Sequence, residues 1–437
     1  MKAPFHVSFF FLIGVLVPVM SCTRATVEPD RPAATVQAYP DLRNSVMVKG
    51  QNRPPRGIQS ILLYRQTPDQ APVIELNSNQ QLTLKFDDLG FDNRRFRVRF
   101  THHDADWSPS SLLPNFFQRG FSEDYITDSQ TSEVQRPAYT HYTYTFPNEN
   151  IELLASGNYM IEVYDYERDE ILFSLPFFVH ENTGRIETRI EELYGLDERY
   201  LMFHQIFATY AYPEDVIIPD TDLETRFVQN HFWGRARVAG IVDTPVTGQI
   251  RSHLARDSSY AGRFEFRSLD LQRLQQEAYN IIEFRPETTP PRVVLMRDVV
   301  NLDMTPRTSQ SHRFGVPVDE TGARYADVYF ELEIPRREQI GKPVYVIGPF
   351  NNWIINENHR MTYDRDRQSY TGNALVKEGL YDYKYAVVEQ GAVNDLRLDA
   401  SFADSRQVYH TFVYFFDPGL QADRLLMVHD HTTRQRF

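Results

Sequence analysis

Hydrophobic and polar residues alternate with a period of two along much of the chain from Ile58 onward. The alternation is clear over residues 82–86, 96–100 and 142–146, and it returns over 328–334 and 381–387. Successive side chains of an extended strand point to opposite faces of a sheet, so this period gives each segment one apolar and one polar face. The pattern therefore predicts β-strands that cover a core on one side only.

Turn-forming residues separate the predicted strands of the N-terminal half. Asp87–Gly90, Pro147–Asn148 and Ser156–Asn158 each carry residues that favour tight turns. Short alternating strands divided by turns are typical of a β-sandwich. We expect a first β-sandwich domain over residues 57–184, ending where Asn182–Gly184 interrupts the pattern.

The remainder is predicted to form two further β-rich parts. Residues 185–318 are expected to be a second β-rich domain, with strands at 200–210, 261–267 and 292–300. A short helix is expected there, with Ser268 as its N-cap, because the following LDLQRLQQEAYN lacks Gly and Pro. Residues 319–437 are expected to be a third, immunoglobulin-like domain. The predicted fold class is mainly β, with tandem immunoglobulin-like β-sandwiches.

The N-terminus has the features of a lipoprotein export signal. Lys2 precedes an uncharged apolar run at 7–20, which is shorter than the roughly 20 residues that span a bilayer. Ser21-Cys22 follows and resembles a bacterial lipobox, which implies cleavage before Cys22 and lipid attachment to its sulfur. We expect a signal peptide at 1–21 and a flexible, lipid-anchored tether at 22–56, rich in Pro, Ala and Gln.

Composition narrows the class of partner. The net charge is −13 and Cys22 is the single cysteine. An acidic chain is a poor ligand for nucleic acid, and a lone thiol makes no internal disulfide. We expect no nucleic-acid partner, no cofactor and no small-molecule substrate.

Candidate chemistry concentrates in one polar cluster, residues 102–107 (HHDADW). Imidazoles and carboxylates ligate metals, but adjacent histidines on a strand point to opposite faces. The aspartates are instead expected to cap the turn before Ser108, and no metal site is predicted. Established hydrolase and phosphate-binding motifs are absent. A non-catalytic protein is therefore expected, with an envelope hydrolase that uses His103, Asp104 and Asp106 as a competing hypothesis.

One segment near the C-terminus resembles glycogen-binding and early-set immunoglobulin-like modules. Gly348–Trp353 reads G-P-F-N-N-W, and Gly379–Lys384 reads G-L-Y-D-Y-K. The resemblance implies the fold, and it makes Phe350 and Trp353 possible glycan contacts, although such aromatics more often fill a sandwich core. A glycan-binding envelope lipoprotein is thus an alternative function, and it requires Trp353 to be exposed.

Several ordered blocks together resemble the plug protein family of the Bacteroidetes type IX secretion system. The blocks are Phe86–Leu89, His103–Ser110, Tyr139–Tyr142, Phe146–Asn148, Ser156–Tyr159, Val163–Tyr164, Arg199–Tyr200, His204–Gln205, Val228–Asn230 and Phe264–Leu269. Within them, a structural or interface role is assigned to Asp87, Asp88, Asp104, Asp106, Trp107, His141 and Asn158.

The resemblance implies a function without catalysis. Members dock at the periplasmic mouth of a very large outer-membrane β-barrel translocon and close its pore when it is idle. That barrel is the expected partner. The expected location is the periplasm, with the chain tethered to the outer membrane by its N-terminal lipid.

Overall fold

The computed structural model describes most of one compact unit, Asp41–Phe437, while Met1–Pro40 form a separate unit. Besides Met1, the described residues are 42–90, 94–134, 136–194, 202–262, 266–274, 280–300, 315–334, 339–399 and 407–433. The predicted signal peptide, Cys22 and the block Arg199–Tyr200 lie outside the described residues.

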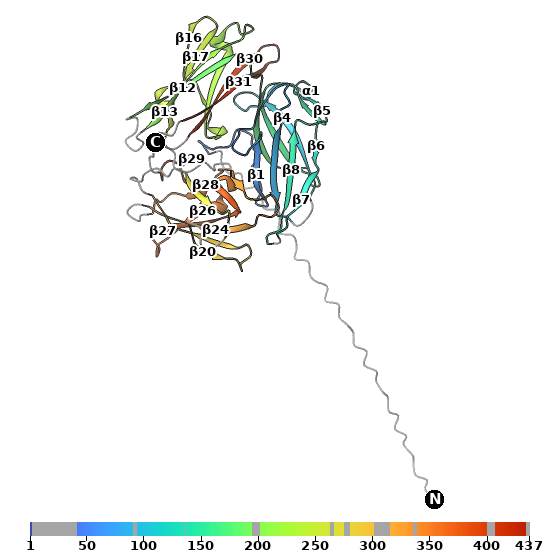
Figure 1. The fold of residues 1–437 in the computed structure, drawn as a ribbon, viewed down its shortest axis with the longest axis vertical. Helices are drawn as coiled ribbons and strands as arrows, with labels where there is room; N and C mark the ends of the chain where they lie inside the picture. Colours follow the sequence, from blue (N-terminus) through green and yellow to red (C-terminus); the bar gives the residue numbers. More distant parts are fainter. Residues whose placement is uncertain are drawn as a thin grey trace. The chain divides into compact units, whose positions relative to one another are not determined.

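Strands dominate the described residues, which confirms the predicted mainly β fold (Figure 1). Two sheets face each other in the N-terminal part, here called the first sandwich. One has the order β1 (Ile58–Tyr64), β3 (Leu82–Asp88), β8 (Thr140–Phe146), β7 (Asp128–Thr131). The other has the order β2 (Val73–Glu75), β11 (Glu170–His180), β10 (Gly157–Asp165), β4 (Phe96–His103), β6 (Asp124–Ile126). A short pair, β5 (Gln118–Gly120) and β9 (Ile151–Leu153), follows the helical turn α1 (Pro114–Phe117).

The alternating sequence explains how the first sandwich is filled. Leu82, Leu84 and Phe86 are fully buried, whereas Thr83 and Lys85 between them are half-buried. Phe96, Val98 and Phe100 of β4 enter the same core from the opposite sheet. Each strand thus buries the apolar face that its period-two pattern predicts.

A second pair of sheets, here called the second sandwich, draws strands from distant parts of the chain. One sheet has the order β12 (Arg185–Leu193), β13 (Phe203–Ala211), β17 (Gln249–His253), β16 (Ile241–Val246), with β18 (Tyr260–Ala261) beside β13. The other has the order β15 (Arg237–Val238), β14 (Leu223–Gln229), β30 (Val408–Asp417), β31 (Ala422–Thr432). Short helical turns in this part are α2 (Pro219–Asp222), η1 (Trp233–Arg235) and η2 (Arg256–Ser258).

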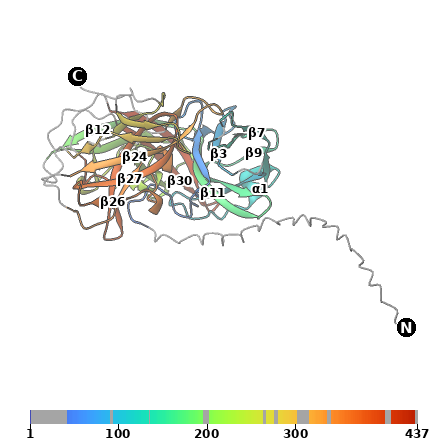
Figure 2. The same cartoon turned by 90° about the horizontal axis from the view of Figure 1, so that it is seen from below.

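The remaining strands form one long sheet, here called the third body. Its order is β19 (Arg267–Asp270), β28 (Gly379–Glu389), β25 (Val344–Ile347), β26 (Arg360–Asp364), β27 (Ser369–Lys377), β24 (Tyr325–Glu333), β21 (Arg292–Leu295), β20 (Ile281–Arg285). β22 (Asp298–Val299), β23 (Val316–Pro317) and β29 (Ala392–Asn394) pair off this path, and η4 (Pro349–Asn351) and η5 (Glu357–His359) lie in its loops. Leu269 and Ile281, from its two ends, enter one core, so the sheet folds back on itself. β24 and β27 run side by side within it (Figure 2).

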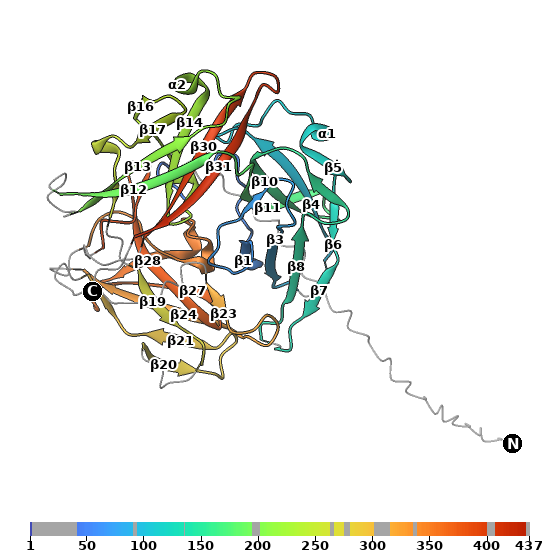
Figure 3. The same ribbon diagram turned by 45° about the horizontal axis from the view of Figure 1, so that its top comes forward.

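The sheet pairings cross the boundary predicted at residue 318/319. β30, from the predicted third domain, pairs with β14 of the predicted second, and β31 pairs with β30 in the same sheet (Figure 3). Conversely, β19 and β21, from the predicted second domain, pair with β28 and β24. Hydrophobic alternation marks a segment as a strand but does not name its neighbour, so a boundary drawn along the sequence misses both exchanges.

The helix predicted after Ser268 is wrong at its start. Ser268 lies inside β19, paired with Asp382 of β28. Residues 275–279 of the same prediction lie outside the described residues. Pairing with an existing sheet edge outweighs the modest helix propensity of a short segment. No helix among the described residues is long and apolar enough to cross a membrane.

Part of the predicted tether is folded. Residues 42–56, here called the strap, run through the junction of all three parts. The Arg43 amide donates to Gly391 of the third body, Gly234 of the second sandwich donates to Val46, and Ser174 of the first sandwich donates to Asn52. The composition of the strap gave no sign that it is folded, because its backbone rather than its side chains makes most of these hydrogen bonds.

We predict that Gly234→Ala will detach the strap. A Cβ at Gly234 would lie 1.9 Å from the carbonyl oxygen of Met47, closer than atoms can approach. Overpacking of this kind costs about 1–3 kcal/mol or more. The measurements are the urea unfolding midpoint and the rate of proteolytic cleavage within residues 42–56, which should rise.

Gly57→Ala is the matched control, since its Cβ would meet nothing closer than Asp88 Oδ1 at 3.9 Å. Equal effects of the two substitutions on cleavage of the strap would contradict the assignment.

Candidate functional site at the seams of the first sandwich

The family-motif residues gather where the first sandwich meets the rest of the unit. Asp87 and His141 face the third body, and Asp104 and Asn158 face the β30–β31 hairpin. We name these two contact regions the Asp87 seam and the hairpin seam.

Two cross-strand pairs meet at the Asp87 seam. Asp87 of β3 lies opposite His141 of β8, and Tyr325 of β24 lies opposite Lys377 of β27. Asp87 Oδ2 accepts from Lys377 Nζ at 2.7 Å and from the Tyr325 hydroxyl at 2.5 Å. Asp87 Oδ1 lies 2.6 Å from His141 Nδ1. One carboxylate therefore joins two sheets that are far apart in sequence.

The seam shields these charges from bulk solvent. Asp87 is fully buried and Lys377 is 2% exposed. Burial lowers the pKa of the Lys377 ammonium, although the Asp87 carboxylate acts in the opposite direction. Lys377 Nζ also donates to the Glu320 carbonyl at 2.6 Å and lies 4.3 Å from the centre of the Tyr139 ring. The adjacent cavity, lined in part by Tyr325 and Lys377, measures about 20 Å³, so the group has room for a water but not for a substrate.

Asp88 points the other way and holds the start of β4. Its carboxylate accepts from the Gly90 amide at 3.1 Å and lies 3.4 Å from Arg94. Burial raises the pKa of Asp88, against the lowering effect of Gly90 and Arg94. Arg94 also binds Asp165 of β10 at 2.6 Å. Asp88 thus stabilises the β3–β4 connection inside the first sandwich.

Polar groups at the hairpin seam pair reciprocally. The amide of Asp423 donates to Asp104 Oδ1 at 3.0 Å, and the amide of Ala105 donates to Asp423 Oδ2 at 2.9 Å. Asn158 donates to the Asp104 carbonyl at 3.0 Å and accepts from the Tyr414 hydroxyl at 2.7 Å. Both side-chain amide atoms of Asn158 and one carboxylate oxygen of Asp104 thus have partners, as polar groups in a seam require.

An ion pair and an aromatic cluster complete the hairpin seam. Arg424 of β31 makes two bonds of 2.7 Å to the Glu181 carboxylate, and this hydrogen bonding raises the pKa of the guanidinium. Trp107 packs against Phe178 with ring centres 5.6 Å apart, and Phe178 contacts Phe412 of β30 at 4.7 Å. Trp107 therefore belongs to a core shared by the two sandwiches.

The side chains of the polar cluster 102–107 form separate local hydrogen bonds. His102 lies 2.8 Å from Ser110 Oγ and 3.0 Å from the Ser156 carbonyl, whereas His103 contacts Thr101 and the Trp107 carbonyl. Asp106 accepts from the Ser108 amide at 2.8 Å, which is the turn-capping role expected. No group of three or more potential ligands among the described residues could hold a metal ion. His103, Asp104 and Asp106 thus each bind a different partner within the chain.

The aromatic residues considered for glycan contact are interior. Phe350 is 7% exposed and Trp353 is 9% exposed. Trp353 packs between Phe232 and Phe266, with ring centres 5.6 and 5.5 Å away. The exposure that the glycan alternative requires is therefore wrong for Trp353, because this side chain joins the third body to the second sandwich.

Sequence reasoning missed the partners on the other side of each seam. Lys377, Tyr325, Tyr414 and Asp423 lie in strands whose local patterns are ordinary. The weak signal available was a lysine that ends β27 directly after Ala374-Leu375-Val376 and is followed by Glu378-Gly379. Charges at strand ends are common, so the pattern alone does not distinguish a buried lysine.

We predict that Lys377→Met will destabilise the protein strongly. Removing one member of a buried pair leaves the other charge unpaired, which typically costs about 3–5 kcal/mol. Urea unfolding of Asp87→Asn, Lys377→Met and the double variant forms the test. The double variant should lose less free energy of unfolding than the two single variants lose together.

Arg95→Met is the control, since Arg95 and Glu167 form a pair in which both side chains are 64% exposed. It should leave the midpoint almost unchanged. Strict additivity of the Asp87 and Lys377 losses would contradict the coupling.

We also predict a loss of stability in mild acid that depends on His102. Burial lowers its pKa from 6.5 to about 4, so the folded protein resists a proton that the unfolded chain accepts. Stability from this group is complete above pH 6.5 and is lost as the pH falls toward 4, by on the order of 3 kcal/mol. Urea midpoints measured from pH 7.5 to 4.5 should fall less steeply for His102→Gln.

Some slope should persist in that variant, because burial also lowers the pKa of His359 to about 4. An unchanged slope in His102→Gln would show that His102 does not titrate in this window.

Comparison with known protein families gives a match to the first sandwich. Residues 58–181, the first sandwich, match the family described as type 9 secretion system plug protein 1st domain. No curated protein matches the chain.

Two solved structures match the chain, one over most of its length and one over a quarter of it. The crystal structure of a hypothetical protein from Parabacteroides merdae has a TM-score of 0.80 at 23% identity, over 88% of this chain and 99% of that one. It shows that the whole fold occurs elsewhere. The NK cell receptor NKp44 covers 25% of this chain and 96% of its own at 14% identity, and its TM-score of 0.13 carries no argument.

The match covers the sandwich that contains the motif residues of both seams. Over this domain, residues 58–181, the chain matches the first domain of the type IX secretion system plug proteins.

Proposed function

We propose that the protein docks at the periplasmic mouth of the outer-membrane barrel translocon of type IX secretion and closes its pore when no cargo passes. The observation that carries the proposal is the family match of the first sandwich. The two buried seams support it, because they join this sandwich to the rest of the unit.

Closing a wide pore requires a body that does not deform. Domains connected only by linkers move relative to one another by default. Here Asp87, Lys377 and Tyr325 join the first sandwich to the third body. Glu181 and Arg424 join it to the β30–β31 hairpin. A stopper of this kind presents one rigid surface to the barrel.

Apolar side chains exposed around α1 are available for such a contact. Leu113, Phe116 and Phe121 are 63%, 55% and 63% exposed. Exposed apolar groups of this size commonly mark interaction sites. The arginines of β4, by contrast, are engaged within the chain: Arg97 pairs with Glu123 and Asp169, and Arg99 pairs with Glu123. The Arg97 side chain is only 15% exposed, so these arginines are ion-paired groups rather than free cations for a barrel rim.

We further propose that the chain is a lipoprotein, anchored through Cys22 in the outer membrane, and that it acts by binding alone. Ser21-Cys22 after an uncharged apolar run supports the anchor. Two or more acyl chains hold a protein stably on a membrane. An anchored body stays at high effective concentration near its barrel, so an interface of modest strength suffices and can release.

The test is a pull-down in mild detergent from native membranes, with a tag placed after Phe437. We expect recovery of an outer-membrane barrel protein several times larger than the bait. Deletion of the gene should raise the uptake of large hydrophilic solutes, because the idle barrel then stays open, and re-expression should reverse this.

Cys22→Ser is the matched control for the anchor. It should release the protein from the membrane and still recover the barrel when supplied at high concentration. Failure of the wild-type chain to recover any barrel, under conditions that preserve other envelope complexes, would refute the proposed function.

A further inference from the structure

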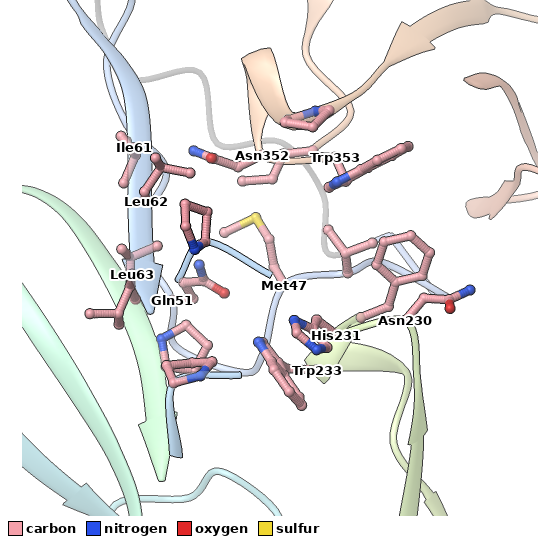
Figure 4. A pocket seen from close by; sticks show the side chains of 18 of the residues that line it. Met47, Gln51, Ile61, Leu62, Leu63, Asn230, His231, Trp233, Asn352 and Trp353 are labelled. Atoms are coloured by element: carbon pink, nitrogen blue, oxygen red, sulfur yellow. The ribbon is translucent and has the colours of Figure 1, made fainter. Parts of the chain in front are cut away.

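A pocket lies where the strap and all three parts of the unit meet (Figure 4). Its volume is about 150 Å³ and it is open to solvent. Leu62 of β1, Met47 of the strap, Trp233 of η1 and Asn352-Trp353 of the third body line it. We call it the junction pocket. It is separate from the Asp87 seam and the hairpin seam, and neither the fold nor the proposed function accounts for it.

Unusual backbone conformations gather at this pocket. Asn230 and His231 have φ of 57° and 58°, and Asn352 and Trp353 have φ of 52° and 60°. All four residues line the pocket. Left-handed backbone is rare for side chains as large as histidine and tryptophan, and it persists where the surrounding structure enforces it. Such strain clusters at ligand sites, where it sets the position of a contacting group.

Two polar groups at the pocket have no hydrogen-bond partner among the described residues. Trp233 is 9% exposed, and its indole N–H makes no hydrogen bond to any described residue. The side-chain amide of Asn352 likewise has none among the described residues. Figure 4 shows the indole nitrogen on the pocket side of Trp233 and the Asn352 amide extended across the pocket toward β1. The indole N–H is not among the fully buried unpartnered atoms, so water can bond to it in the open pocket, and a ligand must supply an acceptor in place of that water.

The lining also defines the charge and size of a ligand. None of the residues around the pocket is Asp, Glu, Lys or Arg. A charged group of a ligand would lose hydration in the pocket without meeting an opposite charge, so the lining selects against charged ligands. The walls are mostly apolar, with prolines at 68, 72, 176 and 349 beside the two tryptophans. A cavity of about 150 Å³ accepts a benzene-sized group.

We infer that the junction pocket receives one aromatic or branched apolar side chain from an extended segment of a partner polypeptide. The backbone amide beside that side chain satisfies the Trp233 N–H and the Asn352 amide. Aromatic-lined grooves are a known way to bind extended peptide segments. This inference rests on the proposed function, and the partner it names is the periplasmic side of the barrel.

The position of the pocket gives this contact a specific consequence. A side chain inserted there touches the first sandwich, the second sandwich, the third body and the strap at once. Binding therefore depends on the relative positions of all three parts, and a partner anchored there senses the assembled unit rather than one domain.

The experiment fills the pocket. Leu62 is half-buried on β1 with its side chain in the pocket, so Leu62→Trp should occupy the space. The probe is N-acetyl-L-phenylalanine amide, a neutral amide with one aromatic ring, titrated calorimetrically. Wild type should bind it in the millimolar range and Leu62→Trp should not. Barrel recovery in the pull-down should fall at least tenfold with Leu62→Trp.

Val242→Trp is the matched control, since Val242 of β16 is 42% exposed and does not line the pocket. It should bind the probe and recover the barrel as wild type does. Trp233→Phe provides a second variant, which keeps the ring and removes the N–H. It should weaken probe binding about fivefold, and it keeps the inference testable if Leu62→Trp does not fold.

The outcomes separate this inference from the proposed function. A folded Leu62→Trp protein that recovers the barrel as well as wild type overturns the inference and leaves the plug function intact. Equal probe binding by wild type, Leu62→Trp and Trp233→Phe also overturns it. If wild type recovers no barrel, the proposed function fails, and the barrel is removed as the partner whatever the probe does.

Discussion

The buried contact between Asp87 and Lys377 is the constraint on which the arrangement of this protein depends. Each charge is almost completely removed from water, so each is tolerable only while the other is within hydrogen-bonding distance. The two residues lie 290 positions apart and belong to different sheets. Separating the first sandwich from the third body would leave both charges unpaired, or would expose to water a surface that is buried in the folded protein. The pair therefore makes the relative position of two bodies a condition of stability.

The C-terminal hairpin imposes a second, largely independent constraint. β30 completes a sheet with β14, and the following turn and β31 carry Asp423, Arg424 and Leu425 onto the first sandwich. The chain thus returns to its first folded domain with its last two strands. The strap contacts all three parts as well, so segments near both ends of the described chain hold the parts together. A protein built in this way transmits force between its parts, which fits the proposed role better than a row of independently hinged domains would.

Resemblance to a family located half of each seam. Asp87, His141, Asp104 and Asn158 are recognisable as motif positions, but nothing local distinguishes an aspartate that caps a turn, such as Asp106, from one that bonds across a seam, such as Asp104. Their partners, Lys377 and Tyr414, are separated from them by 290 and 256 residues. A sequence pattern spans a few residues, so it carries no information about contacts over such distances.

The sequence by itself determined which segments are strands and which face of each is buried. Alternation over 82–86 and 96–100 was sufficient, because the side-chain period of a strand is local and the cost of exposing Leu84 or Phe100 is high. Only the tertiary structure decided which strands pair, that β30 and β31 belong with β14, that residues 42–56 form a strap rather than a tether, and that Trp353 is interior. Backbone hydrogen bonds are alike at every strand edge, so the choice among edges depends on side-chain packing between segments that meet only in the folded chain.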